Sequence, residues 1–115
     1  MPSTAPLDAI LHQPVRTRIV AYLAGRGEAT FSDLKRVLGL TDGNLDAHLR
    51  KLLDAGYVTQ RIDESSARSA THYALTPLGR QALRAYFEEL RALLEFAAPE
   101  RPAPRARRRT RLARS

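Results

Sequence analysis

The chain has 115 residues, of which 43% are hydrophobic and 27% charged, with 19 Lys or Arg against 12 Asp or Glu and no cysteine. This length accommodates one small domain, and the composition is that of a globular protein rather than a collagenous or wholly disordered chain. The lack of cysteine excludes a disulfide framework, a thiolate metal site and a cysteine nucleophile.

The chain begins with residues 1–6, which we expect to be flexible, and continues into a short helical turn before Pro14. The turn is indicated by three apolar residues at helical spacing, Leu7, Ile10 and Leu11. Because proline fits the first turn of a helix, a second helix is predicted from Pro14 to about residue 24, ended by Gly25 and Gly27.

Two short helices joined by a tight turn are predicted next, and each begins at a threonine. Thr30 opens a sequence typical of a capping box, with Asp33 at its fourth position, and Gly39 ends this helix. Its predicted apolar stripe is Leu34, Val37 and Leu38. Thr41 caps the next helix, whose inward face is formed by Leu45, Leu49, Leu52 and Leu53. Two helices joined by a short glycine-containing turn form the helix-turn-helix unit.

The pattern changes to extended structure at residue 57. Residues 57–62 and 71–75 read as two strands separated by a polar segment, which predicts a two-stranded hairpin with a long tip. Thr76 and Pro77 then supply a cap and a first helical residue for a final helix that runs to about Ala97.

The apolar surface of this final helix is wider than packing on its own domain requires, since one packed face covers an arc of about 100°. The stripe expected to face the core is Leu83, Phe87, Leu90 and Leu94. The surplus predicts a homodimer, in which Tyr86, Leu93 and Phe96 face the partner. The complete predicted dimer interface is Leu7, Ile10, Leu11, Tyr86, Leu90, Leu93 and Phe96.

The net charge of +7 is located in the last part of the chain. Residues 101–115 contain seven arginines and no acid, whereas residues 1–100 contain twelve basic and twelve acidic residues. Within residues 28–64, seven acids exceed five bases, so this stretch has a net charge of −2. Residues 98–115 are therefore predicted to be a disordered arginine-rich tail on a domain of residues 7–97 that is close to charge-neutral.

The order of these elements resembles the winged helix-turn-helix transcriptional regulators of the MarR and ArsR type. The resemblance spans about residues 7–96 and is carried by residues 12–16, 31–35, 40–52, 54–58 and 73–80. It implies a fold that is mainly α with a small β-hairpin and a long C-terminal helix. It also implies a cytoplasmic, nucleoid-associated homodimer that binds double-stranded DNA sequence-specifically as a transcriptional regulator, more often a repressor. The helix from Asp42 to Ala55 would enter the major groove, and the hairpin would touch the backbone or the minor groove.

The candidate DNA-binding residues lie on the outward side of this helix and on the hairpin. Small residues at positions 43 and 47 allow close approach to base edges, Asn44 suits an adenine edge, and Arg50 or Lys51 suits phosphate or guanine. The complete set is Thr41, Asp42, Gly43, Asn44, Ala47, His48, Arg50, Lys51, Arg61 and Arg68. The alternative interpretation of the same residues is a capped first turn followed by a solvated helix face.

Other chemistries find less support in the sequence. The three histidines, His12, His48 and His72, fall in different predicted elements, so no metal site is expected, and no motif predicts a cofactor or an enzyme. No membrane segment is predicted. Two possibilities stay open: a small-molecule effector at the dimer interface, and a winged-helix protein-interaction module that does not bind DNA sequence-specifically.

Overall fold

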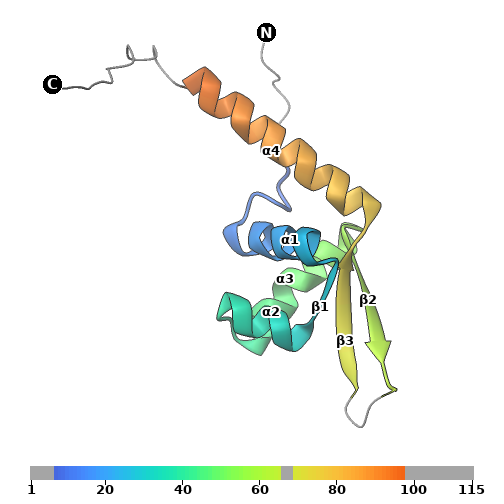
Figure 1. Cartoon of the computed structure of the whole chain (residues 1–115). Coiled ribbons are helices and arrows are strands. Elements are labelled where there is room, and N and C mark those ends of the chain that lie inside the picture. The colour runs from blue at the N-terminus through green and yellow to red at the C-terminus, as the bar shows by residue number, and fades with distance from the viewer. Residues whose placement is uncertain (1–6, 66–68, 98–115) are drawn as a thin grey trace, which may run out of the picture.

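The computed structural model describes residues 7–65 and 69–97, which form four helices and a three-stranded sheet (Figure 1). In chain order the elements are α1 (Pro14–Arg26), β1 (Glu28–Thr30), α2 (Phe31–Leu38), α3 (Asp42–Asp54), β2 (Val58–Asp63), β3 (Ala70–Leu75) and α4 (Pro77–Ala97). Helices α1, α2 and α3 gather beside the sheet, the β2–β3 hairpin extends away from them, and the end of α4 projects in another direction. This is the predicted winged helix-turn-helix fold with a long C-terminal helix.

Helices α2, α3 and α4 begin at the three predicted threonine caps. In each case the threonine Oγ1 accepts a hydrogen bond from a backbone N–H three residues later. The pairs are Thr30 with Asp33 at 3.0 Å, Thr41 with Asn44 at 3.2 Å and Thr76 with Gly79 at 2.9 Å. These bonds satisfy N–H groups that have no partner within the helix, so the sequence fixes where each helix starts.

The predicted turn before Pro14 is present at residues 9–11. The Asp8 side chain accepts the N–H groups of Ile10 and Leu11 at 2.8 and 3.1 Å, and the N–H of His12 bonds to the Asp8 carbonyl at 2.7 Å. Helix α1 departs from the prediction, since it passes through Gly25 and ends later, at Arg26. Gly27, with φ +91°, is the residue that ends it, and its N–H bonds to the Leu23 carbonyl at 2.7 Å.

The sheet has three strands rather than the predicted two. β3 is central and pairs antiparallel with both β2 and β1, with Arg61 and Thr30 both opposite His72. β1 has only three residues, which is too short for the alternation that indicates a strand. Its partner is also distant in sequence. The predicted hairpin is therefore confirmed in β2 and β3, and the third strand, β1, was not predicted.

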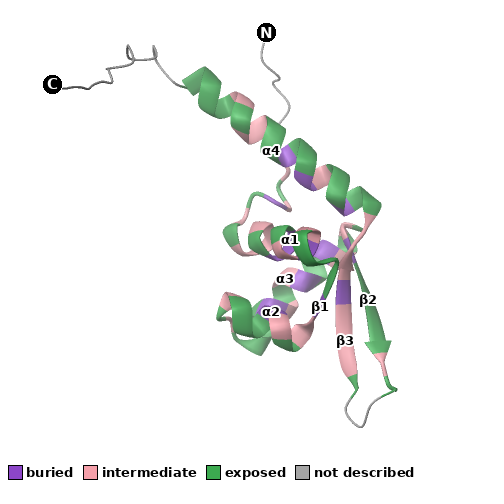
Figure 2. Cartoon of the chain, viewed as in Figure 1, coloured by how far each residue is buried: buried purple, intermediate pink, exposed green. Residues whose placement is uncertain are grey.

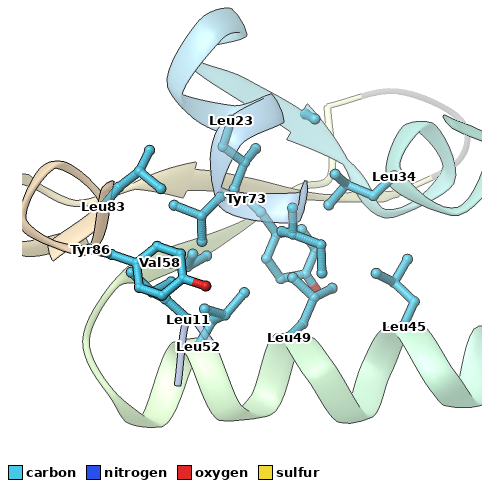
Figure 3. Packing of buried hydrophobic residues seen from close by; sticks show 13 residues of the cluster. Leu11, Leu23, Leu34, Leu45, Leu49, Leu52, Val58, Tyr73, Leu83 and Tyr86 are labelled. Carbon is cyan, nitrogen blue, oxygen red and sulfur yellow. The ribbon is translucent and has the colours of Figure 1, made fainter. Parts of the chain in front are cut away.

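The core lies where α1, α3, the sheet and the first half of α4 meet (Figure 2). Figure 3 shows Leu45, Leu49 and Leu52 of α3 pointing into a cluster that also contains Leu34 and Tyr73. The leucine face of α3 is therefore confirmed, and its opposite face is left to solvent. In α2 only Leu34 is buried. Val37, predicted to be in the stripe, is 40% exposed, so this part of the prediction was wrong.

Helix α4 packs on the core with a different face from the one predicted. Leu83 and Tyr86 are buried, whereas Phe87 is 47% exposed and Leu94 is 71% exposed. Tyr86 is held inward by the segment before α1, since its hydroxyl lies 2.9 Å from Nδ1 of His12. The assignment of Phe87 and Leu94 to the core was therefore wrong.

Two predicted interface residues also belong to the core of their own chain. Leu11 is fully buried and Tyr86 is 6% exposed, so neither presents a surface to a partner. Leu11 is the last residue of the turn at residues 9–11 and belongs to the hydrophobic core. The residues that remain in the predicted interface are Leu7, Ile10, Leu90, Leu93 and Phe96.

None of the described helices is long and apolar enough to cross a bilayer.

Candidate nucleic-acid interface

Helix α3 is held in place by the turn that precedes it and by a contact from α2. Gly39 adopts φ +67°, and the N–H groups of Gly39 and Leu40 both reach the Lys35 carbonyl, at 2.9 and 3.2 Å. Nζ of Lys35 lies 2.8 Å from a carboxylate oxygen of Asp42 in the first turn of α3. The carboxylate also suits the positive end of the helix dipole. The angle between the two helices is therefore fixed at the N-terminus of α3.

The outward face of α3 contains most of the predicted DNA-binding residues in one contiguous strip. Thr41 and Asp42 lie at its start, and Gly43, Asn44, Ala47, Arg50 and Lys51 are all exposed along it. A Cβ added at Gly43 would meet nothing within 4 Å, so the backbone there is open to solvent. The strip combines an amide, two cations and two small residues on a helix whose other side is anchored by buried leucines.

The cations near this face are largely matched by acids. Arg50 pairs with Asp46 at 2.9 Å, and on the sheet Arg61 pairs with Glu28 at 2.8 Å. Among the described residues, Lys51 has no carboxylate within 4 Å. Exposed pairs of this kind contribute only about 0–1 kcal/mol, so a phosphate could replace either carboxylate at little cost.

His48 lies at the border of the face and contacts the body of the domain. Its Nδ1 is 3.2 Å from Nη1 of Arg16, whose Nε donates to the Ile10 carbonyl at 2.6 Å. Burial and the neighbouring Arg16 charge both lower the pKa of His48. A neutral imidazole that accepts a hydrogen bond from Arg16 therefore joins α3 to α1. His48 thus helps to hold α3 in place, in addition to its predicted contact with DNA.

This contact predicts a pH dependence of stability. Because the pKa of His48 is lower in the folded chain than its ordinary value of 6.5, the unfolded chain binds more protons as the pH falls below that value. The free energy of unfolding should therefore fall when the pH is lowered from 7 to 5.5. In the His48→Gln variant this fall should be smaller than in the wild type. Urea unfolding at both pH values measures the difference. Equal losses would show that His48 does not contribute.

The sheet carries a cluster of charged and titratable side chains drawn from all three strands. Glu28 receives a hydrogen bond from Arg61 and also lies 2.9 Å from Nδ1 of His72, at an angle outside hydrogen-bond geometry. Nε2 of His72 is 4.0 Å from Asp63. Hydrogen bonds from Ser65 lower the pKa of that aspartate, so it remains ionised. Arg68, the predicted wing arginine, lies outside the described residues.

Two residues of this surface were missed in the sequence. Asp46 stands four residues before Arg50, and this spacing on a helix already indicates an ion pair. Glu28 could not be found in the same way, because its contact with Arg61 depends on the register of β1 and β2 on β3. Within residues 7–65 and 69–97, no group of three or more His, Asp or Glu is placed to hold a metal ion.

The chain belongs to the winged helix DNA-binding domain family, whose model matches residues 15–94. It is 38% identical over 81 residues to the uncharacterized protein MJ0432 of Methanocaldococcus jannaschii, an alignment that covers 70% of this chain and 88% of the relative.

Solved structures show the same architecture. A transcriptional regulator homologue from Pyrococcus horikoshii OT3 is 33% identical, with a TM-score of 0.73 over 78% of this chain and 89% of the other. A MarR mutant from E. coli, crystallised with operator DNA, is 20% identical, with a TM-score of 0.61 over 70% of this chain and 56% of the other. The second comparison establishes a shared fold. Together with the family match, these structures identify a winged helix domain of the kind found in transcriptional regulators.

Proposed function

We propose that the protein is a homodimeric transcriptional regulator, more specifically a repressor, that binds DNA sequence-specifically through the outward face of α3. The observation that carries this proposal is the exposed strip of α3. It combines small residues with base-reading side chains on a helix that is rigidly backed by the core. The operator complex of the MarR mutant supports it by the shared fold.

The chemistry of the strip suits base edges in the major groove. Gly43 and Ala47 allow the helix backbone to approach closely, and the Asn44 amide can both donate to and accept from an adenine. The guanidinium of Arg50 can donate to a guanine, and Lys51 can reach a phosphate. Two such helices in a dimer would occupy half-sites about one helical turn of DNA apart. The hairpin would then lie along the backbone or the minor groove.

The homodimer is proposed from the apolar surface that α4 leaves uncovered. Leu93 is 50% exposed and Phe96 is 71% exposed on the part of α4 that extends beyond the domain in Figure 1. A monomer would leave this surface in water at a cost of about 25 cal/mol per Å², and Phe87 and Leu94 are exposed on another side of α4. A second copy of the same helix offers the matching apolar face, as two-fold symmetric dimers do.

The dimer predicts a change of mass on mutation. Leu93→Glu combined with Phe96→Glu should convert the wild-type dimer to a monomer, because two charges would be buried in an apolar contact. Sedimentation equilibrium at micromolar concentration measures the mass. Leu78→Glu is the matched control, since Leu78 is 53% exposed at the other end of α4 and should leave the dimer intact. A monomeric wild type would contradict the dimer.

Residues 101–115 are proposed to add attraction to DNA that is independent of sequence. Their seven arginines can release counterions from phosphates. Residues 1–100 have equal numbers of acids and bases, so they contribute little to the free energy of counterion release. A chain ending at residue 100 should bind specific and random duplexes more weakly by a similar factor, with a shallower salt dependence in fluorescence anisotropy. An unchanged salt slope would show that the arginines do not engage phosphate.

Regulation by a small molecule is proposed at a groove of about 440 Å³ between α4 and the segment before α1. Its wall includes Asp8 and Tyr57, whose hydroxyl donates to that carboxylate at 2.5 Å. This hydrogen bond and burial raise the pKa of Tyr57 to about 12. The groove and the proposed dimer surface share α4, so an occupant could alter the spacing of the two α3 helices through that helix.

Selection of bound fragments from random-sequence DNA tests the proposed function. The proposal predicts an enriched pseudo-palindrome, because two identical helices read two half-sites. The acids on and around α3 favour a second candidate, a winged helix that binds a protein partner without reading DNA sequence. Recovery of no enriched sequence would overturn the first candidate and support the second.

A further inference from the structure

Asp46 and Arg50 form an ion pair at one edge of the outward face of α3. Nε of Arg50 donates to Oδ2 of Asp46 at 2.9 Å, and the side chains are 73% and 51% exposed respectively. Because Nε is occupied, the free donors of the guanidinium are the two terminal nitrogens, Nη1 and Nη2. Neither of them has a hydrogen-bond partner among the described residues.

The pair lies near a buried tyrosine of the sheet. Tyr73 of β3 is 6% exposed, and Figure 3 shows its ring beside Leu49 with the hydroxyl directed toward α3. Burial raises the pKa of Tyr73, the Asp46 charge raises it further, and the Arg50 charge lowers it, so both members of the pair lie near this phenol.

We propose that Asp46 is a positioning residue that makes Arg50 selective for guanine. This inference rests on the proposed function. An arginine can approach guanine through Nε and one terminal nitrogen or through both terminal nitrogens. The carboxylate removes the first option and directs Nη1 and Nη2 together at O6 and N7 of one guanine.

The Asp46 carboxylate is also expected to lower the affinity for DNA of any sequence. It brings a negative charge close to the phosphates, so it weakens binding to every sequence. Removal of Asp46 should therefore raise affinity for random DNA while it frees Arg50 to contact other bases or phosphates. If the pair only stabilised the helix, removal of Asp46 would leave the base preference at the Arg50 position unchanged.

The test measures base preference in fluorescence anisotropy with duplexes that carry each of the four base pairs at the position where Arg50→Ala loses discrimination. The wild type should prefer guanine there by about tenfold, the size expected for one bidentate contact. Asp46→Ala should reduce this preference to about twofold and bind random duplex more tightly, since a repulsive charge is gone. Asp46→Asn, which retains an acceptor for Nε, should keep part of the preference.

Asp54→Ala is the matched control, because Asp54 is an exposed acid on the same helix. It should raise affinity for random DNA in a similar way and keep the full guanine preference. An unchanged preference in Asp46→Ala, an equal loss in Asp54→Ala, or a base other than guanine at the Arg50 position would overturn the inference. If the wild type enriches no sequence at all, the proposed function fails, and this inference fails with it.

Discussion

Replacement of both Asn44 and Arg50 by alanine should lower affinity for the selected duplex by about a hundredfold, since each base contact contributes about 1–3 kcal/mol. Affinity for random DNA should fall only a few-fold, because one cation is lost. Both side chains are exposed and only Arg50 has a side-chain partner among the described residues, so the fold should be unaffected. Competition titrations with the two duplexes, with circular dichroism to confirm folding, measure the ratio.

The matched control takes an amide and an arginine from a surface remote from α3. Gln81 and Arg84 are both exposed on α4, and their replacement by alanine should leave both affinities within about twofold of the wild type, since neither contacts DNA in the proposed complex. Equal losses on selected and random DNA in the double variant would show that Asn44 and Arg50 touch only the backbone. In that case other residues would determine the preference for the selected sequence.

Gly79→Ala should destabilise the domain by about 3 kcal/mol or more, at the upper end of the cost of overpacking. An added Cβ would lie 2.1 Å from the carbonyl oxygen of Tyr57 and 2.8 Å from Cδ1 of Leu75. The first of these is backbone, so the start of α4 and the segment leading into β2 would have to separate. For a domain of this size the melting temperature should fall by at least about 10 °C.

Gly25→Ala is the control, because it is expected to raise the free energy of unfolding rather than lower it. Gly25 lies within α1, and an added Cβ there would meet nothing within 4 Å. The alanine should stabilise the helix by about 0.5–1 kcal/mol because it restricts the unfolded chain and favours helix. Thermal unfolding of the three proteins at one concentration ranks them. A Gly79→Ala protein as stable as the wild type would contradict the close packing of α4 on the chain near Tyr57.

The local signals in the sequence were sufficient for the helices. Thr30, Thr41 and Thr76 each opened a helix as predicted, and the leucine spacing of α3 identified its buried face. These features depend on residues within one or two turns of each other. The exposed strip of α3 followed from the same periodicity, because a helix with one buried face presents the other to solvent.

The features that sequence reasoning missed depend on contacts between distant residues. His12 and Tyr86 are 74 positions apart, yet their contact turns Tyr86 inward and leaves Phe87 exposed. The pairing of β1 with β3 likewise joins segments separated by two helices, and it creates the Glu28–Arg61 contact. A periodic stripe indicates that a helix has an apolar face, but packing determines which part of a wide face is buried.

The central claim is that the outward face of α3 contacts DNA, and NMR titration of the ¹⁵N-labelled protein with the selected duplex tests it most directly. The largest changes in amide chemical shift are expected at Gly43, Asn44, Ala47 and Arg50, with smaller changes along the hairpin and little change in the second half of α4. Changes confined to α4, with the amides of α3 unmoved, would contradict the account.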